Sequence, residues 1–160
     1  SRADHNFWYE PLPEYESWRY VDFRKDAWQV VYGSLKGFDG SDYLLDARRT
    51  TKDMPEALAL ARLGTDIAGL IQLNPSAQAS RGVGYIPFLY LQEKYRNKGL
   101  GVQLIGYAVS FFRKLDRDKL RLRVAPCNER ALRFYQKHGF TKIGEDSDML
   151  GGTYVMEMKI

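Results

Sequence analysis

The sequence predicts one α/β domain in which helices cover both faces of a mixed central sheet, in three layers. Two observations support this prediction. Two apolar runs come first and are joined by a short glycine turn, as in an antiparallel hairpin. A strand–helix–strand unit follows between Val83 and Val124, and a connection of this kind makes two strands parallel with a right-handed crossover. A chain of 160 residues, of which 44% are apolar, is long enough for one such core.

The chain begins with an aromatic N-terminal arm, residues 1–20, which is also rich in proline. Pro11 and Pro13 argue against a helix, because proline lacks an N–H donor and restricts the residue before it. We expect the arm to pack on a single domain formed by residues 21–160, or to add an edge strand to its sheet. The alternative is an interface with a partner or a preceding domain, because a large exposed apolar patch marks an interaction site.

A first helix is predicted directly after the arm. Asp22 is a suitable N-cap for a helix over residues 23–35, and Gly37 is a suitable end. One face of this helix carries Ala27, Val30, Val31 and Ser34.

A second helix and a hairpin come next. The helix covers residues 41–50 and is capped by Ser41 or Asp42. The apolar runs 57–63 and 67–73 are joined by a Gly-Thr-Asp turn, which predicts two antiparallel strands.

The centre of the chain reads as a strand followed by a long amphipathic helix. The strand, residues 83–91, is a continuous apolar and aromatic run, typical of a strand that is buried on both faces. The helix extends to about residue 115, and its apolar side chains recur at three- and four-residue spacing. These side chains are Leu104, Ile105, Ala108, Phe112 and Leu115.

The turn between this strand and this helix has the composition of an anion site. Arg96 and Lys98 supply positive charge, and Gly99 and Gly101 permit close approach of the backbone to a ligand. The first N–H groups of a helix have no partner within it, and the helix dipole adds positive charge there. These features suit a phosphate or pyrophosphate, although an ordinary tight turn would also contain the glycines. The Walker spacing is absent, and Leu104 stands where a dinucleotide fingerprint needs its third glycine.

The rest of the chain supplies further strand and helix signals. Residues 120–124 alternate strictly between leucine or valine and arginine, as in a half-buried strand. Asn128 is a good N-cap for the helix that follows. Two more strands are predicted over 140–144 and 154–160, with a polar loop between them. The helix after Asn128 is expected to bury Ala131, Leu132 and Tyr135.

Two motifs in this second half are similar to those of a known family. Arg96-x-x-Gly99-x-Gly101 resembles the acyl-CoA signature (Gln or Arg)-x-x-Gly-x-(Gly or Ala) of the GNAT superfamily of N-acetyltransferases. The segment 128–140, NERALRFYQKHGF, looks like the family's N-x-x-A-x-x-F-Y-x-K-x-G-F segment. The motifs stand in the family's order and separation, and the resemblance is strong over residues 83–143.

The resemblance implies a GNAT-like fold, whose mixed, mostly antiparallel sheet splays at a parallel strand pair. It implies that acetyl-CoA binds in that opening as a co-substrate. The pantetheine arm would pair with the backbone of Leu89, Tyr90 and Leu91, and Asn128 would contact the arm as well as cap its helix. The pyrophosphate would be held by backbone amides of Arg96, Asn97, Lys98, Gly99, Leu100 and Gly101.

Tyr135 occupies the family's general-acid position. Acyl transfer from a thioester to an amine expels a thiolate, and a nearby phenol can protonate that sulfur as charge develops. The alternative is that Tyr135 is only a core aromatic of its helix.

The sequence does not identify a general base. Many family members use a carboxylate on the central strand, and residues 83–91 contain none. Tyr85 lies near the expected position, and Glu93 is expected to face solvent. Cys127 has no histidine close in sequence that would suit a nucleophile, so an incidental thiol is the better interpretation. One cysteine and two histidines form no metal-ligand cluster.

The composition limits the remaining classes of function. A net charge of +4 suits an anionic cofactor and is too small to indicate nucleic-acid binding. No apolar run reaches the ~20 residues of a membrane span. The single cysteine excludes an internal disulfide, so a cytoplasmic protein is expected.

We therefore expect an N-acetyltransferase that moves an acetyl group from acetyl-CoA directly to an amine of a small molecule or a protein, without a metal. The alternative is a non-catalytic acyl-CoA-binding regulatory module of a larger protein, which the missing strand carboxylate and the missing initial methionine favour. A homodimer, or a fused or preceding domain, is left open. Nucleic acid and membrane are not expected partners.

Overall fold

The fold is built on one twisted sheet of seven strands. A computed structural model describes residues 5–147 and 151–160. In spatial order the strands are β1 (Trp8–Pro11), β2 (Leu58–Leu63), β3 (Asp66–Asn74), β4 (Val83–Leu91), β5 (Lys119–Val124), β7 (Thr153–Lys159) and β6 (Thr141–Asp146). The β4–β5 pair is parallel and the other five pairs are antiparallel, which confirms the predicted mixed, mostly antiparallel sheet. Part of the predicted loop after β6, residues 148–150, lies outside the described residues.

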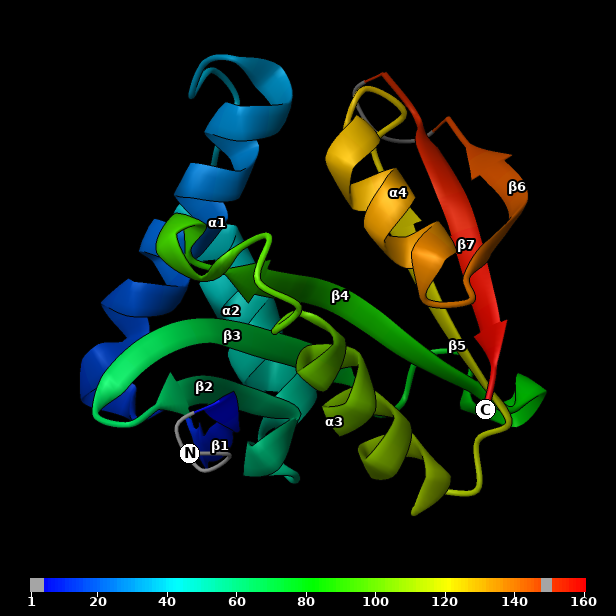
Figure 1. Ribbon diagram of the computed structural model, residues 1–160, viewed down its shortest axis with the longest axis horizontal. Coiled ribbons are helices and arrows are strands. Elements are labelled where there is room, and N and C mark those ends of the chain that lie inside the picture. Colours follow the sequence, from blue (N-terminus) through cyan, green and yellow to red (C-terminus); the bar gives the residue numbers. More distant parts are fainter. Residues whose placement is uncertain (1–4, 148–150) are drawn as a thin grey trace.

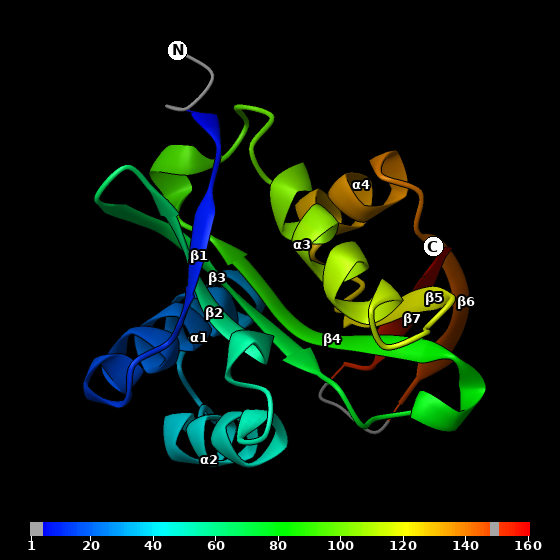
Figure 2. The ribbon, with the colours of Figure 1, turned by 90° about the horizontal axis from the view of Figure 1, so that it is seen from below.

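Helices cover both faces of the sheet. Helices α1 (Ser17–Tyr32) and α2 (Gly40–Thr51) lie on one face, and α3 (Val102–Arg113) and α4 (Glu129–Lys137) lie on the other (Figures 1 and 2). The alternation of β4 divides the core accordingly, because Phe88 and Tyr90 pack with α1 and α2 while Leu89 packs on the α3 side. The three-layer prediction is confirmed. None of the helices in the described ranges is long and apolar enough to cross a membrane.

The aromatic arm contains the edge strand β1, one of the two expected arrangements. Trp8 pairs with Arg62 and Pro11 with Ala59 in an antiparallel register. The Tyr9 hydroxyl donates to the Gln103 carbonyl at 3.0 Å. The arm is thus tied to the domain at both β2 and α3.

Helix α1 begins earlier than predicted. The expected start at Phe23 is wrong, because a 3-10 turn at Glu14–Glu16 follows Pro13 and runs directly into a helix from Ser17. Asp22 is consequently a residue of the helix interior rather than its N-cap.

The same helix also ends earlier than predicted. Gly33 adopts the left-handed conformation, with φ of 71°, and its N–H donates to the Gln29 carbonyl at 2.8 Å. Gly37 is therefore not the end. The buried side chains of α1 are Tyr20 and Phe23, whereas Val30, on the face noted in the sequence, is 56% exposed.

The remaining elements lie close to their predicted ranges. The N-cap of α2 is Asp39, whose Oδ1 accepts from the Asp42 N–H at 3.2 Å, so the predicted cap at Ser41 or Asp42 is wrong. The N-cap of α4 is Asn128, as predicted, and its Oδ1 accepts from the Ala131 N–H at 3.2 Å.

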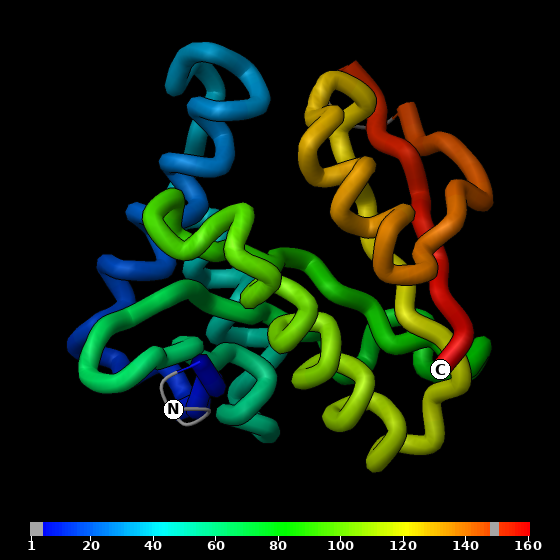
Figure 3. The backbone as a smooth tube through the Cα atoms, viewed as in Figure 1, coloured from blue at the N-terminus to red at the C-terminus, as the bar shows by residue number. Residues whose placement is uncertain are grey.

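Strands β4 and β5 separate soon after they begin. They pair from Val83 and Lys119 only as far as Tyr85 and Arg121, although both strands continue. Figure 3 shows the backbones of β4 and β5 running apart beyond their paired segment. The splay that the family resemblance implied is therefore present.

A bulge in β4 lies where the two strands part. The register with β3 shifts between Asn74–Tyr85 and Gln72–Phe88, which gives β4 one extra residue, at Ile86–Pro87. Pro87 has no N–H to donate to a ladder, and a bulge beside an unpaired edge is a position where a strand tolerates proline.

Candidate active site

The opening between β4 and β5 leads into a large cleft. The cavity has a volume of about 580 Å³ and reaches both faces of the sheet. Leu89 and Leu91 line it from β4, and Leu122 and Val124 line it from β5. It therefore lies at the carboxyl ends of the parallel pair, where ligands bind in open α/β sheets.

The free edge of β4 directs backbone groups into this opening. The Gln92 N–H donates to the Ala68 carbonyl at 2.8 Å, across the ladder with β3. Because alternate residues of an antiparallel strand bond to the same neighbour, Phe88 and Tyr90 also direct their backbone groups to β3. Leu89 and Leu91 direct theirs toward the splay, where β5 does not pair with them.

The loop before α3 presents a run of free amides. The backbone N–H groups of residues 97–101 donate to no group within residues 5–147 and 151–160. Asn97 and Gly99 are left-handed, with φ of 59° and 74°. Consecutive free amides at a helix N-terminus form an anion-binding concavity.

Gly101 is needed for space rather than for an unusual conformation. Its φ is −61°, which any residue adopts. A Cβ added there would lie 2.9 Å from Cε1 of Phe134, on α4. A glycine at this position therefore lets α4 approach the start of α3.

Arg96 connects the loop to the end of β4. Its Nε donates to the Leu91 carbonyl at 2.6 Å, and its Nη2 lies 3.6 Å from Asp26 of α1. Asp26 also accepts from the Tyr90 hydroxyl at 2.5 Å. Burial and this carboxylate raise the pKa of Tyr90 above its usual range. These contacts hold the end of β4 in place. Arg96 therefore has a structural role in addition to the positive charge noted in the sequence.

Tyr135 lies on α4 beside the cleft. Its ring packs edge-on against Phe134 and Phe140, with both ring centroids 5.4 Å away. The hydroxyl makes no hydrogen bond to any described residue, and burial raises the pKa of Tyr135 well above its usual range. At neutral pH the side chain is therefore a protonated phenol that can donate to a ligand in the cleft.

Asn128 lies at the rim of the cleft, where β5 leads into α4. Its side-chain oxygen is used to cap α4. Its amide nitrogen makes no hydrogen bond within the described residues, so it remains available to a ligand.

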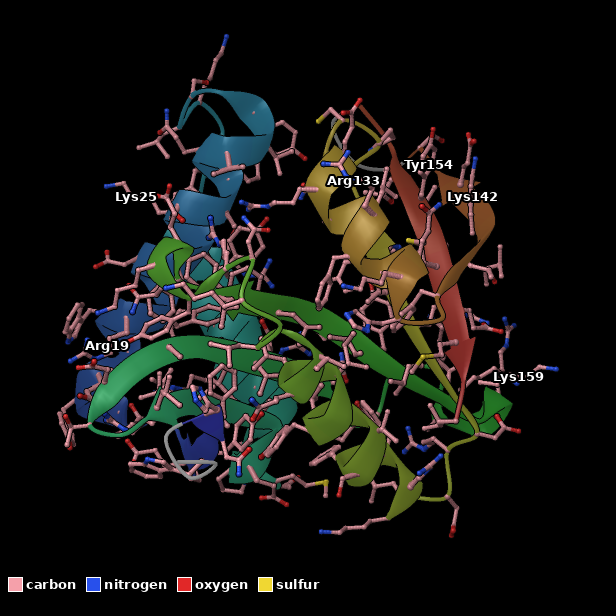
Figure 4. The ribbon with its side chains drawn as sticks, viewed as in Figure 1. Arg19, Lys25, Arg133, Lys142, Tyr154 and Lys159 are labelled. Carbon is pink, nitrogen blue, oxygen red and sulfur yellow. The ribbon has the colours of Figure 1, made fainter. Side chains whose placement is uncertain are left out.

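The cleft is strongly cationic. None of its described lining residues is an aspartate or glutamate, whereas six of them are basic. These are Arg24, Arg96, Arg123, Arg130, Arg133 and Lys137, of which Arg133 is labelled on α4 in Figure 4. Of these six residues, only Arg96 was predicted from the sequence to lie at the site. The spacing of positions 130, 133 and 137 on one helix face could have revealed the three on α4, but Arg24 comes from a distant part of the chain.

The other residues considered from the sequence lie at the margins. Tyr85 is not among the residues that line the cleft. Burial raises the pKa of Tyr85, and the positive charge of the nearby Arg123 offsets part of this increase. Glu93 is exposed, as predicted. Cys127 is exposed, and its Sγ lies 3.5 Å from the Val31 carbonyl.

Comparison with known proteins agrees with this architecture. The sequence model of the acetyltransferase (GNAT) family matches residues 8–140. N-alpha-acetyltransferase 30 of Xenopus laevis is 32% identical over 90 residues, which are 55% of this chain and 33% of that protein. The chain thus spans about a third of the length of this curated relative.

Two solved structures share the fold over nearly the whole chain. Ard1 from Thermoplasma volcanium superposes with a TM-score of 0.72 at 19% identity, covering 96% of this chain and 97% of that one. Naa50 of Arabidopsis thaliana, in complex with the bisubstrate analogue CoA-Ac-MVNAL, superposes with a TM-score of 0.70 at 18% identity, covering 97% and 99%.

The comparisons give no support to a non-catalytic acyl-CoA-binding module. The family match covers the splayed strands, the free amides of residues 97–101 and Tyr135, and the curated relative is a named N-alpha-acetyltransferase. The chain belongs to the GNAT family of acetyltransferases, whose acyl donor is acetyl-CoA.

Proposed function

We propose that this chain transfers the acetyl group of acetyl-CoA either to the α-amino group of a peptide or to the amino group of a small molecule. The observation that carries the proposal is the opening between β4 and β5, because the cleft runs through it from the anion-binding loop to the α1–α2 face of the sheet. Thioester and amine can meet through such an opening from opposite faces.

Different residues of the cleft are suited to different parts of acetyl-CoA. The free amides of residues 97–101 are suited to the pyrophosphate, and Lys98 adds positive charge beside them. The outward backbone groups of Leu89 and Leu91 are suited to the amide groups of pantetheine and to the thioester carbonyl. The amide nitrogen of Asn128 is suited to the same arm.

Tyr135 completes the chemistry of transfer. When bound, acetyl-CoA supplies an activated acyl carbon. The amine forms the new C–N bond, the C–S bond breaks, and the Tyr135 hydroxyl donates its proton to the departing sulfur. The proton lost from the amine passes to solvent, and Tyr135 is reprotonated from solvent.

The absence of a carboxylate among the described lining residues favours α-amines over lysine side chains. An α-amino group has an ordinary pKa near 8, whereas that of a lysine amine is near 10.4. At neutral pH the neutral fraction of an α-amine is therefore roughly 100-fold larger. The relatives point the same way, since one is a named N-alpha-acetyltransferase and another is bound to a CoA–peptide conjugate.

A competition between two peptides tests the proposal. One peptide has a free α-amine and no lysine, and the other has a blocked N-terminus and one lysine. With acetyl-CoA at neutral pH, we expect release of CoA and acetylation of the first peptide, detected by mass, with a preference of roughly 100-fold. Binding of acetyl-CoA without transfer to any amine would overturn the proposal.

Three earlier expectations stay predictions. They are the division into an arm and one domain, a partner or preceding domain bound at the aromatic arm, whose Trp8, Tyr15 and Trp18 rings are exposed, and a cytoplasmic location. A homodimer also stays open.

A further inference from the structure

Arg24 is held rigidly in the cleft by groups that carry no charge. Its Nε donates to the Tyr20 hydroxyl at 3.0 Å, and its Nη2 donates to Oε1 of Gln72 at 3.0 Å. Its guanidinium carbon lies 4.2 Å from the ring centroids of both Tyr43 and Phe88. Hydrogen bonds and cation–π contacts together fix the side chain in one orientation.

This arginine lacks a carboxylate partner, which two other partly buried arginines have. Arg62 pairs with Glu10, and Arg121 pairs with Glu157, each at 2.6 Å. Among residues 5–147 and 151–160, no carboxylate lies within 4.0 Å of the Arg24 nitrogens, and its Nη1 donates to no group. The Nη1 atom is not enclosed by protein either. A partly buried guanidinium with a free amino group is suited to a bidentate or charge-assisted bond with a carboxylate.

The position of Arg24 assigns it to the acceptor and not to the acetyl donor. It comes from α1 and packs on Phe88, so it lies on the α1–α2 face of the sheet. The loop of free amides and Tyr135 belong to α3 and α4 on the other face (Figure 2). Trp28, one turn further along α1, also lines the cleft, and its enclosed indole N–H donates to no described residue.

We propose that Arg24 selects acceptors that carry a carboxylate close to the reacting amine. This inference rests on the proposed acetyltransferase function and adds the chemistry of its substrate. The carboxylate has two sources: the side chain of an N-terminal glutamate or aspartate in a peptide, or the α-carboxylate of a free amino acid. In both, the negative charge of the acceptor offsets the cost of holding a guanidinium in the cleft without a partner.

Isosteric substrate pairs test the selection directly. Peptides that begin with Glu or Gln and are otherwise identical report a side-chain carboxylate, and free leucine against leucinamide reports an α-carboxylate. We expect the carboxylate member of one pair to have a kcat/KM higher by roughly 10- to 100-fold, the range for a hydrogen bond to a charged group. The pair that shows the difference identifies the source.

Variants of Arg24 connect the preference to this side chain. Arg24→Gln is expected to abolish the preference, mainly through a higher KM, while the affinity for acetyl-CoA measured by calorimetry stays unchanged. Arg24→Lys keeps the charge and is expected to retain part of the preference. Lys25→Gln is the matched control, because Lys25 is the next residue of α1 and lies on its outer side (Figure 4).

The outcomes separate the inference from the proposed function. Equal rates within both pairs, or a preference that survives in Arg24→Gln, would overturn the role of Arg24 while acetyl transfer stands. Transfer to no acceptor would overturn the proposed function and this inference with it. Calorimetric binding of the Glu peptide but not the Gln peptide to the CoA-saturated protein, lost in Arg24→Gln, would support the inference without reference to turnover.

Discussion

At the scale of single residues, Tyr135 shows how surroundings decide chemistry. Its side chain is partly buried and its hydroxyl has no partner among the described residues. Burial raises the pKa of Tyr135, and the phenol stays protonated throughout the neutral range. A phenol in this state can give a proton to a thiolate but cannot accept one from an amine. The structure therefore favours the acid role for Tyr135 and leaves proton removal to the acceptor's own low pKa.

Replacing Tyr135 with Phe tests this role. The hydroxyl makes no hydrogen bond within the described protein, so its loss should leave the fold and the acetyl-CoA affinity intact. We expect kcat to fall by roughly 100-fold, the lower range for general acid catalysis, as measured by steady-state release of CoA. Tyr154→Phe serves as the control, since Tyr154 lies on β7 under Lys142 and outside the cleft (Figure 4). An unchanged kcat in Tyr135→Phe would leave Tyr135 a packing residue only.

Sequence patterns predicted roles for Tyr135 and the glycine loop but not for Arg24. Tyr135 and the loop each belong to a contiguous motif, so the residues next to them in sequence indicate their roles. Arg24 becomes meaningful only beside Gln72 and Phe88, which are 48 and 64 positions away. A single arginine on an amphipathic helix has no local signal that distinguishes it from a solvated one.

At the scale of elements, the junction of α3 and α4 depends on one missing side chain. Gly101 has an ordinary φ, and a Cβ there would overlap the ring of Phe134. Gly106 lies within α3, whereas Gly101 is its N-cap, and a Cβ at Gly106 would meet nothing within 4 Å. A side chain is therefore excluded at Gly101 but has room at Gly106.

Alanine substitutions at these two glycines should have opposite effects. Gly101→Ala displaces Phe134, which packs on Tyr135, and we expect the free energy of unfolding to fall by about 1–2 kcal/mol. Gly106→Ala removes backbone freedom from an exposed helix position, and we expect a rise of up to about 1 kcal/mol. Urea unfolding of both variants measures the difference. A rise in both would show that the α3–α4 junction has room for a methyl group.

The ends of elements were the least predictable features. The long β4–α3 unit and the Asn128 cap were predicted because glycines, apolar spacing and an amide side chain mark them locally. The start of α1 was wrong because a 3-10 turn after Pro13 extends the helix without a recognisable cap. The bulge at Pro87 was not predicted, because it depends on where β5 leaves β4.

At the scale of the whole molecule, tyrosines couple stability to pH. Burial raises the pKa of seven of them, which lie in the sheet and in the helical layers on both of its faces. They are Tyr9, Tyr20, Tyr32, Tyr85, Tyr90, Tyr107 and Tyr135. In the unfolded chain each ionises near pH 10. Above that pH the unfolded state loses protons that the folded state keeps.

The sign of this linkage predicts loss of stability in alkali. The burial of neutral tyrosines contributes its full stabilisation below about pH 10, and the contribution falls as pH rises further, because the unfolded state then binds fewer protons than the folded state. Tyr135 adds a slope of at most about 1.4 kcal/mol per pH unit, and more exposed tyrosines, such as Tyr32, add less because solvent screens them. We expect the free energy of urea unfolding to fall as the pH rises above about 10.

Single tyrosine variants separate this effect from the general loss of lysine charge in alkali. Tyr135→Phe removes one buried ionisable group without removing a described hydrogen bond, so its free energy of unfolding should fall less steeply with pH than that of the wild type. Tyr15 is 82% exposed, so Tyr15→Phe should leave the slope unchanged. Equal slopes in all three proteins would mean that Tyr135 ionises as readily in the fold as in the unfolded chain. The same result would leave the acid role itself standing, because a tyrosine of ordinary pKa near 10 is also protonated at neutral pH; kcat of Tyr135→Phe tests that role separately.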